Sequence, residues 1–406
     1  MTQRILIIGA GFAGMWSALA AARVLDNENR ADGSIEIALI APEPALHLRP
    51  RFYEAGAANM KAPLGEIFDE AGVRFIHGRV TRIRTNENEV DVMDHDGRTS
   101  TMSYDRLVLA AGSRLFTPDI PGLREHSFNV DQIADAARLE AHINNLASLP
   151  DTPGRNTVVI GGGGFTGIET AAEMPARLRA TLGDRASIHV IIVEQGDHIG
   201  PDLGPGPRPV ITQALQDLGV TWRVGTAVTD IDAGGLRIST GERIDSKTVI
   251  WTAGARASAL TEQIPAERDR FGRLHVDRNL RVIGLDNVFA TGDVAYAATD
   301  DQGNYALMSC QHALNLGRYA GHNVASDLLG LPALPYTQTR YVTCLDLGPW
   351  GAVYTEGWDR AVKLTGAEAK QRKRWINTER IYPPPANRAE ALAAADPQRI
   401  VVQPGR

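Results

Sequence analysis

Short runs of consecutive apolar residues, each followed by a glycine turn or a polar loop, recur along the chain. The first run, at positions 5–8, is typical of a strand buried on both faces of a parallel sheet. An alanine-rich segment follows it and predicts a helix. Similar apolar runs occur at positions 34–40, 106–111, 158–160, 187–193, 248–253 and 287–290. Such strands alternating with helices predict an α/β fold on parallel sheets.

The remaining segments predict smaller elements. We expect short strands at 73–77, 79–84 and 89–93, and a helix over 133–146. A longer helix is expected from about 305 to 329, because Gly330 and Pro332 are typical of a helix end. Strand-like pieces lie at 340–347 and 351–355. The proline- and alanine-rich tail from Pro383 predicts an extended arm with one short helix.

A glycine turn follows the first strand. Gly9, Gly11 and Gly14 have the spacing G-x-G-x-x-G between the strand and the helix. The first glycine makes the tight turn, the second lets the backbone approach a pyrophosphate, and the third lets helix and strand pack closely. The helix N-terminus then offers free N–H donors to the anion. This pattern predicts a dinucleotide site at the start of the chain.

The same pattern occurs a second time. Shifting the chain by 153 positions places the first three glycines on Gly162, Gly164 and Gly167, and positions 34–41 on 187–194. Two matched blocks at one offset indicate an internal duplication of a dinucleotide-binding unit.

The two copies differ where the second strand ends. This position normally carries the acid that binds a ribose 2′-OH, and it is Glu194 in the second copy but Ala41 in the first. An acid there would repel a 2′-phosphate, so the second unit should prefer NAD over NADP. In the first unit, Glu43 either replaces the missing acid or is a solvated loop carboxylate.

Bulk properties narrow the class of protein. The chain has 406 residues, 43 % apolar and 22 % charged, which indicates a soluble protein of two or three domains. A net charge of −6 argues against a nucleic-acid partner, and we expect no metal site. No apolar run is long enough for a transmembrane helix, and no signal peptide is evident. The two cysteines, Cys310 and Cys344, are far apart in sequence, which favours a reducing cytoplasm and excludes a redox pair of adjacent cysteines.

Four further sequence blocks carry a resemblance to a known family. They are the glycine-rich turn ending in Glu169, the strand around Trp251, the Phe-Ala-Thr-Gly block ending in Asp293, and a helix that begins Cys310-Gln311. In this order they resemble the two-dinucleotide-binding-domain flavoproteins of the pyridine nucleotide–disulfide oxidoreductase superfamily, over residues 1 to about 330. Within that superfamily the chain looks like a type II NADH dehydrogenase.

The resemblance implies two Rossmann-like domains, one for FAD and one for NAD, with the second inserted into the first. The domains would be 1–120 and 257–330 for FAD, 121–256 for NADH, and a small C-terminal interface or tail region at 331–406. It also implies which residues contact each cofactor. Those expected at FAD are Gly9, Ala10, Gly11, Phe12, Ala13, Gly14, Glu43, Arg49, Arg51, Val80, Ala111, Gly112, Gly292, Asp293 and Gln311. Those expected at NADH are Gly162, Gly163, Gly164, Phe165, Thr166, Gly167, Glu169, Glu194 and Gly254.

Two residues are candidates for the catalytic step. Glu169 could orient the nicotinamide carboxamide or relay a proton to the acceptor, or it could be an acid favoured by the helix dipole. Gln311 could hydrogen-bond the flavin or the acceptor, or it could be a polar residue of a helix surface. For the neighbouring His312 a structural role is favoured over titration near the flavin.

The chain departs from the type II pattern in ways that bear on the electron acceptor. Only Gln311, Ala313 and Gly317 match the family's quinone-site helix, and membrane-anchoring amphipathic C-terminal helices are not evident. Sulfide:quinone reductases share the fold but need cysteines that this chain lacks at the usual places. Because the chain has no adjacent cysteines to form a redox disulfide, electrons on the flavin must pass directly to an acceptor. We expect an NADH oxidoreductase acting on a quinone or similar small acceptor. The alternatives are a reductase of a ferredoxin- or rubredoxin-type carrier and a non-catalytic flavin redox sensor.

A basic run at 370–374 has two interpretations. It could bind an acidic carrier or anionic lipid, or it could be a helix face packed on the core, which we favour slightly. The expected location is the cytoplasm, with peripheral contact at the inner face of the cell membrane as the alternative. For the assembly state, a homodimer is left open.

Overall fold

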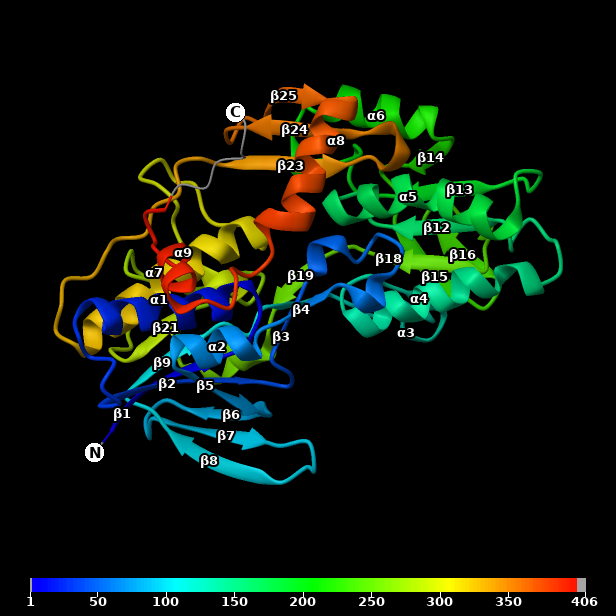
Figure 1. Cartoon of the computed structure of the whole chain (residues 1–406). Coiled ribbons are helices and arrows are strands. Elements are labelled where there is room, and N and C mark those ends of the chain that lie inside the picture. The colour runs from blue at the N-terminus through cyan, green and yellow to red at the C-terminus, as the bar shows by residue number, and fades with distance from the viewer. Residues whose placement is uncertain (1, 400–406) are drawn as a thin grey trace.

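The computed structural model describes residues 2–399, arranged as two lobes joined by C-terminal elements (Figure 1). The first lobe contains a five-stranded parallel sheet in the order β21-β9-β1-β2-β5. Its strands are β1 (Gln3–Ile8), β2 (Ile35–Ala41), β5 (Val73–His77), β9 (Arg106–Leu109) and β21 (Val288–Ala290).

The second lobe contains an equivalent parallel sheet in the order β11-β18-β12-β13-β14. Its strands are β11 (Ser127–Phe128), β12 (Thr157–Gly161), β13 (His189–Val193), β14 (Val220–Arg223) and β18 (Thr248–Trp251). Because β21 follows all of these in sequence but pairs with β9 of the first sheet, the second unit is inserted into the first. The predicted fold class is confirmed.

Helices pack on both sheets. They are α1 (Phe12–Asn27), α2 (Gly65–Ala71), α3 (Leu123–His126), α4 (Ile133–Asn145), α5 (Phe165–Leu182), α6 (Arg208–Asp217) and α7 (Cys310–Leu328). Short 3₁₀ turns occur at Arg49–Arg51, Ala57–Asn59, Leu146–Ser148, Pro201–Leu203, Ala259–Gln263, Gly292–Val294 and Gly348–Trp350. No helix within residues 2–399 is both long and apolar enough to cross a membrane.

Small antiparallel sheets extend the two units. Each unit has a three-stranded meander, made of β6 (Arg79–Arg84), β7 (Glu89–Met93) and β8 (Thr99–Ser103) in the first, and of β15 (Val228–Asp232), β16 (Gly235–Ile238) and β17 (Arg243–Asp245) in the second. Two-stranded pairs are β3 (Ala45–His47) with β4 (Lys61–Pro63), β10 (Ser113–Leu115) with β19 (Ala255–Ala257), and β20 (Leu274–His275) with β22 (Ala295–Tyr296).

The C-terminal elements lie across the two lobes. An antiparallel sheet of β23 (Val342–Asp346), β24 (Ala352–Glu356) and β25 (Ala361–Thr365) is followed by α8 (Gly366–Trp375), a π-helical turn (Ile376–Arg380) and α9 (Arg388–Ala394). In Figure 1 the orange helix α8 runs from this sheet towards the first lobe, where the red helix α9 packs on α1 and α2.

One helix begins later than its sequence predicts. The helix expected from about residue 305 starts at Cys310, because the backbone at Ser309 is extended and its side chain accepts a hydrogen bond from the N–H of His312 at 3.4 Å. Ser309 therefore acts as the N-cap. The strands predicted at 73–77, 79–84 and 89–93, the helix beginning at residue 133 and the two strands after residue 340 are confirmed.

Helices α1 and α7 approach each other very closely. Added Cβ atoms at Gly317 and Gly321 of α7 would collide with the backbone carbonyl oxygens of Ala13 and Ser17 of α1. The buried Ser17 hydroxyl also donates to the carbonyl oxygens of Ala13 at 2.8 Å and Gly317 at 3.1 Å. This contact holds together segments that lie 300 positions apart.

Replacing Gly321 by alanine should therefore destabilise the protein. In an ordinary helix this change stabilises by about 1 kcal/mol. Here the methyl group must push α1 and α7 apart, so we expect a loss of roughly 2 kcal/mol or more. Thermal unfolding followed by circular dichroism would measure it. The matched control is Gly65→Ala at the start of α2, where an added Cβ has no neighbour within 4 Å. Equal unfolding midpoints for the two variants would contradict the close-packing argument.

Candidate functional site

One cavity of about 2050 Å³ extends between the two units and under the C-terminal elements. Residues from both glycine turns line it, including Gly9, Gly11, Gly162 and Gly164. The C-terminal segment contributes its opposite wall through residues such as Lys373. The two duplicated motifs therefore open into one shared space.

The first glycine turn has the geometry of an anion site. Gly9 has a φ of +108°, and an added Cβ would stand 2.5 Å from the carbonyl oxygen of Ala110. An added Cβ at Gly14 would collide with the carbonyl oxygen of Gly9, so the helix packs directly on the turn. At Gly11 nothing lies within 4 Å of an added Cβ, and no side chain caps α1. The N–H groups of the first turn of α1 are therefore available to a ligand phosphate.

The second glycine turn repeats this geometry. Gly162 has a φ of +112°, and an added Cβ would stand 2.9 Å from the backbone nitrogen of Ala253. An added Cβ at Gly167 would collide with the carbonyl oxygen of Gly162, while Gly164 is open and α5 has no side-chain cap. The residues of both turns thus fit a dinucleotide of the kind expected from the sequence.

The acids near the two strand ends are held differently. Glu194 is buried, and its two carboxylate oxygens accept 2.6 Å hydrogen bonds from the backbone N–H groups of Gly163 and Gly196. Glu43 is more exposed, and its oxygens contact Nε2 of His47 at 2.6 Å and Nζ of Lys61 at 2.9 Å. The hydrogen bond from Lys61 is the main cause that lowers the pKa of Glu43. Both carboxylates border the cavity, each fixed by partners of its own unit.

The two arginines expected at FAD have different surroundings. Arg49 borders the cavity, donates to the Ser113 hydroxyl at 2.8 Å, and forms ion pairs with Asp131 and with Asp293, the latter at 3.6 Å. The Ser113 hydroxyl donates to Asp293 at 2.6 Å. Arg51 does not border the cavity and pairs with Glu54 at 2.7 Å instead.

The remaining residues expected to contact FAD or NADH occupy three kinds of position. Those that border the cavity are Ala10, Phe12, Ala13, Ala111, Gly112, Phe165, Thr166, Gly254, Gly292 and Asp293. Gly14, Gly163 and Gly167 lie behind the turns and shape them. Val80 is buried in a hydrophobic cluster beneath the first sheet and does not reach the cavity.

Glu169 and Lys373 form a buried ion pair in the cavity wall. The Nζ atom of Lys373 lies 2.7 Å from Oε1 of Glu169, and both side chains are at most 6 % exposed. Lys373 also donates to the carbonyl oxygen of Cys344 at 3.2 Å, and the N–H of Asp346 donates to Glu169 at 3.0 Å. Burial raises the pKa of Glu169 to about 7, although the charge of Lys373 lowers it. Burial alone would lower the pKa of Lys373, but the charge of Glu169 raises it overall.

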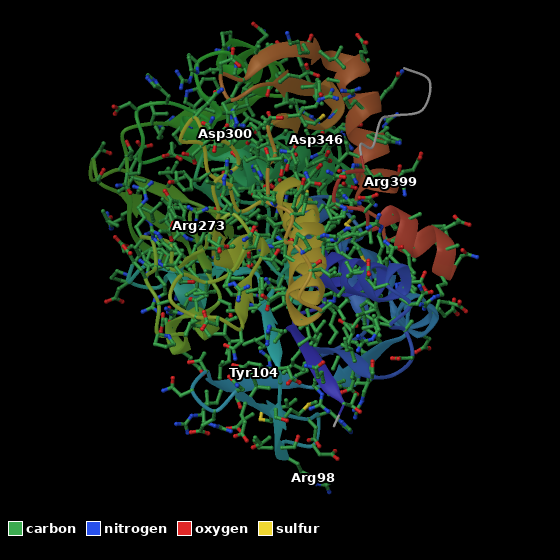
Figure 2. All side chains as sticks on the ribbon, turned by 90° about the vertical axis from the view of Figure 1, so that its left-hand side faces the viewer. Arg98, Tyr104, Arg273, Asp300, Asp346 and Arg399 are labelled. Carbon is green, nitrogen blue, oxygen red and sulfur yellow. The ribbon has the colours of Figure 1, made fainter. Side chains whose placement is uncertain are left out.

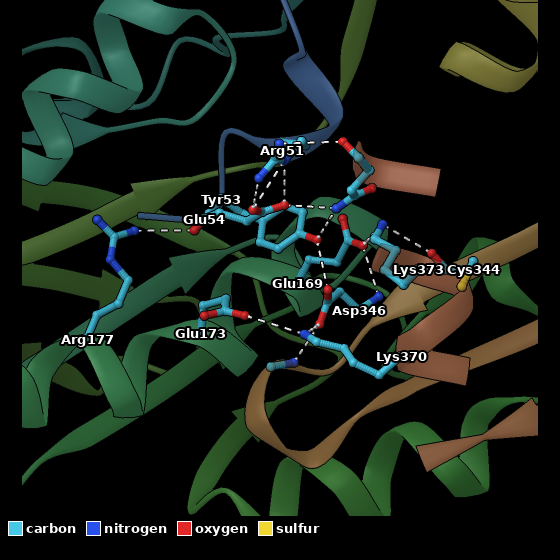
Figure 3. A network of polar contacts seen from close by, with 12 residues as sticks. Arg51, Tyr53, Glu54, Glu169, Glu173, Arg177, Cys344, Asp346, Lys370 and Lys373 are labelled. Atoms are coloured by element: carbon cyan, nitrogen blue, oxygen red, sulfur yellow. Dashed lines mark hydrogen bonds and ion pairs between the residues drawn. The ribbon is translucent and has the colours of Figure 1, made fainter. Parts of the chain in front are cut away.

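This pair belongs to a larger polar network (Figure 3). The Tyr53 hydroxyl donates to Asp346 at 3.1 Å, and Lys370 forms an ion pair with the same carboxylate. Asn377 donates to Glu54 at 2.8 Å. Residues of the first unit, of α5 and of the C-terminal region therefore meet in one group of buried and half-buried polar side chains.

The network includes residues that the sequence did not point out. They are Tyr53, Asp346 and Lys373, which lie far from Glu169 in sequence, so no local motif connects them with it. The sequence signal for the two lysines was the basic run at 370–374. Lys370 and Lys373 are three positions apart, so they lie on the same face of a helix. Both of these lysines point into the protein, which agrees with the packed-helix interpretation of the run.

Gln311 and His312 make internal contacts. The Gln311 side chain donates to the carbonyl oxygen of Val342 at 3.0 Å and accepts from its N–H at 3.3 Å, which joins α7 to β23 at the cavity edge. His312 is fully buried, contacts Gln338 at 3.2 Å and stacks on Tyr341. Burial lowers the pKa of His312 to about 4, so it is neutral at physiological pH and has the structural role that we favoured.

Both cysteines are free thiols. Burial raises the pKa of Cys310 to about 11 and that of Cys344 to about 12. Because a thiolate is the reactive form, neither residue is set up as a nucleophile at neutral pH.

Comparison with known proteins agrees with this architecture. A protein of Mycobacterium tuberculosis named NADH dehydrogenase-like is 48% identical over 410 residues, which is 99% of each chain. A demethylphylloquinone reductase of Synechocystis sp. is 29% identical over 381 residues, covering 92% of this chain and 91% of its own. The solved structure of NDH2 from Plasmodium falciparum in complex with NADH aligns with a TM-score of 0.77 at 14% identity, covering 97% of this chain and 98% of that one.

The family model described as pyridine nucleotide-disulphide oxidoreductase matches residues 3–317. That span contains both glycine turns, both parallel sheets and the first half of α7. The chain belongs to the pyridine nucleotide-disulphide oxidoreductase family.

Proposed function

We propose that this protein is a flavoenzyme that oxidises NADH and reduces a quinone or quinone-like small acceptor. The overall reaction converts NADH, one proton and the quinone into NAD⁺ and the hydroquinone. The observation that carries the proposal is the single cavity, which connects two uncapped glycine turns with the polar network of the C-terminal region. The names of the two relatives, an NADH dehydrogenase-like protein and a demethylphylloquinone reductase, support it.

FAD is the proposed cofactor of the first unit and NADH the substrate of the second. A bound flavin would supply the chemistry by accepting hydride and passing two electrons to the acceptor. The chain would hold its pyrophosphate at the free N–H groups of α1, beside the turn at Gly9 and Gly11. Arg49 and Asp293, which are already fixed by Ser113, would position polar groups of the same ligand.

Glu194 is proposed to select NADH over NADPH. Its buried carboxylate is held rigidly by two backbone N–H groups and borders the cavity at the end of β13. A ribose 2′-OH can donate to such a carboxylate, whereas a 2′-phosphate would place like charges together in a poorly solvated site.

Glu169 is proposed to provide the proton that the quinone needs in addition to the hydride equivalent. A carboxyl group with a pKa of about 7 changes its protonation state near neutral pH, which suits proton transfer. Lys373 keeps the ionised form tolerable in the buried site after the proton has left.

The competing functions have weaker support. An acidic carrier protein would need a basic docking face, but two lysines of the basic run are engaged in internal ion pairs, a buried one for Lys373 and a half-buried one for Lys370. A non-catalytic sensor would not need two complete glycine turns that share one cavity. Direct transfer to a small acceptor is therefore favoured.

A kinetic experiment tests the proposed function. Anaerobic stopped-flow mixing of the purified holoprotein with NADH should bleach the flavin absorbance, and a soluble quinone should restore it. Failure of NADH to bleach the flavin would contradict both enzyme functions. Restoration by ferredoxin or rubredoxin but not by any quinone would favour the carrier reductase.

The Glu194→Gln variant tests nucleotide selection. Its amide removes the charge that repels a 2′-phosphate, so the ratio of kcat/KM for NADH to that for NADPH should fall about tenfold. Steady-state assays with both nucleotides give this ratio. The matched control is Glu242→Gln, which removes a half-exposed carboxylate paired with Arg223 at 3.6 Å and should leave the ratio unchanged. An unchanged ratio in the Glu194 variant would exclude the selection role.

The pH dependence of flavin reoxidation tests Glu169. With the pKa of Glu169 near 7, the reoxidation rate should fall as the pH rises above 7, and Glu169→Gln should remove this dependence. Lys373→Met removes a cation that favours the ionised carboxylate, so it should raise the pKa of Glu169 and shift the fall to higher pH. Lys363→Met, at an exposed position of β25, is the control. A shift to lower pH in the Lys373 variant would refute the assignment.

A further inference from the structure

Three arginines gather at the C-terminal side of the cavity. Arg380 ends the π-helical turn after α8, and Arg399 follows α9; both border the cavity. Figure 2 shows Arg399 close to the C-terminal helices. Opposite them, Gln311, Asn315 and Tyr319 border the same cavity from α7, and their spacing of four places them on one helix face.

The third arginine, Arg318, is buried behind this wall. It is 2 % exposed, donates to the carbonyl oxygen of Ala394 at 3.0 Å, and lies 3.9 Å from the ring centroid of Trp16. These contacts fix α9 and the following segment against α7. Arg318 therefore holds in place the segment that carries Arg399.

None of these three arginines has an ion pair with a carboxylate of residues 2–399. The nearby carboxylate of Asp396 pairs with Arg23 at 3.0 Å. Buried or half-buried arginines usually have an acidic partner. Arg318 is buried and Arg380 is half-buried, while Arg399 is exposed at the cavity edge. Because no carboxylate within residues 2–399 pairs with them, this part of the cavity has room for a bound anion.

Mutual repulsion within the group agrees with this. Burial is the main cause that lowers the pKa of Arg318, to about 9, and the charges of Arg380 and Arg399 lower it further, while Asp396 raises it. Burial likewise lowers the pKa of Arg380, and the charge of Arg399 lowers it further. A bound anion would reduce this repulsion.

The walls around the arginines are partly apolar. Trp375, Ile376, Ile381 and Pro397 border the cavity in the same C-terminal segment. Free N–H groups for pyrophosphates are found instead at the starts of α1 and α5. Apolar walls with a cationic end match a flat ring system that carries one negative group. Arg380 is the last residue of the π-helical turn, a backbone irregularity common at functional sites.

We propose that this side of the cavity binds an electron acceptor that carries an anionic group, such as a carboxylate or sulfonate, next to its quinone ring. Arg380 and Arg399 are the binding residues, and Arg318 is a positioning residue. This proposal rests on the proposed quinone reduction and specifies its substrate class. It adds no redox step: the quinone ring takes up two electrons and two protons as before, and the anionic group remains unchanged.

The test compares two soluble naphthoquinones, 1,4-naphthoquinone-2-sulfonate and neutral 2-methyl-1,4-naphthoquinone. Within each variant the ratio of their kcat/KM values cancels effects common to both substrates. Arg380→Gln should lower the sulfonate-to-neutral ratio about tenfold, as expected for one lost charge-assisted hydrogen bond. Arg399→Gln should lower it in the same direction. The matched control is Arg374→Gln, at an exposed position at the end of α8, which should leave the ratio unchanged.

A binding measurement keeps the test independent of turnover. Quenching of flavin fluorescence in the holoprotein would be titrated with 1-hydroxy-2-naphthoate and with uncharged 2-naphthol. Tighter binding of the naphthoate in the unmodified protein, weakened about tenfold in Arg380→Gln, supports the proposal. Equal binding of the two compounds, or equal quinone ratios in all variants, overturns it. Loss of flavin from Arg380→Gln with an unchanged ratio also overturns it, because Arg380 would then serve the cofactor.

The two proposals can fail separately. If neither quinone reoxidises the flavin, quinone reduction itself is wrong, while the naphthoate titration still decides whether the arginines bind an anion. If both quinones are reduced without charge preference, quinone reduction stands and the anionic substrate class is excluded.

Discussion

The buried ion pair between Glu169 and Lys373 is the interaction on which the arrangement of the cavity depends. Removing two charges from water costs several kcal/mol for each ion, and only a close partner with additional hydrogen bonds offsets this. The two residues come from α5 of the inserted unit and from α8 of the C-terminal region, 204 positions apart. Neither can be buried favourably alone, so the pair requires the C-terminal region to dock on the second unit.

The same docking forms the cavity wall that contains the polar network around Glu169. Lys370, Lys373 and Asn377 lie on one continuous helical segment and contact Asp346, Glu169 and Glu54 respectively. Two lysines of a segment that is strongly basic in sequence thus make internal contacts, while Arg374 of the same segment is exposed. The electrostatic state of the cavity is set by the C-terminal region as much as by the two glycine turns.

How far the sequence could predict this protein follows from the range of each interaction. The turns at Gly9 and Gly162 were predictable because strand, turn and helix are contiguous, and their open N-termini are a local property. The presence of two similar units was predictable because the duplication is visible at one offset, whereas the insertion of the second unit into the first was implied by the resemblance alone. The partners of Glu169 were not predictable, since only the folded chain brings Lys373 and Asp346 beside it. Arg49 borders the cavity, whereas Arg51, two positions later, forms an ion pair with Glu54 instead. The sequence could not predict this orientation of Arg51, because it depends on the folded position of Glu54.

The return of the chain to its first sheet has a consequence for folding. Strand β21 and helix α7 are synthesised only after the whole inserted unit. Helix α1, however, is buried against Gly317 and Gly321 of α7. During synthesis the second sheet is complete once residue 251 has emerged, whereas the first sheet still lacks its edge strand. Contacts of this sequence separation form slowly because long loops must close first. Of the two units, we therefore expect the inserted one to become native first, although synthesis begins with the N-terminal one.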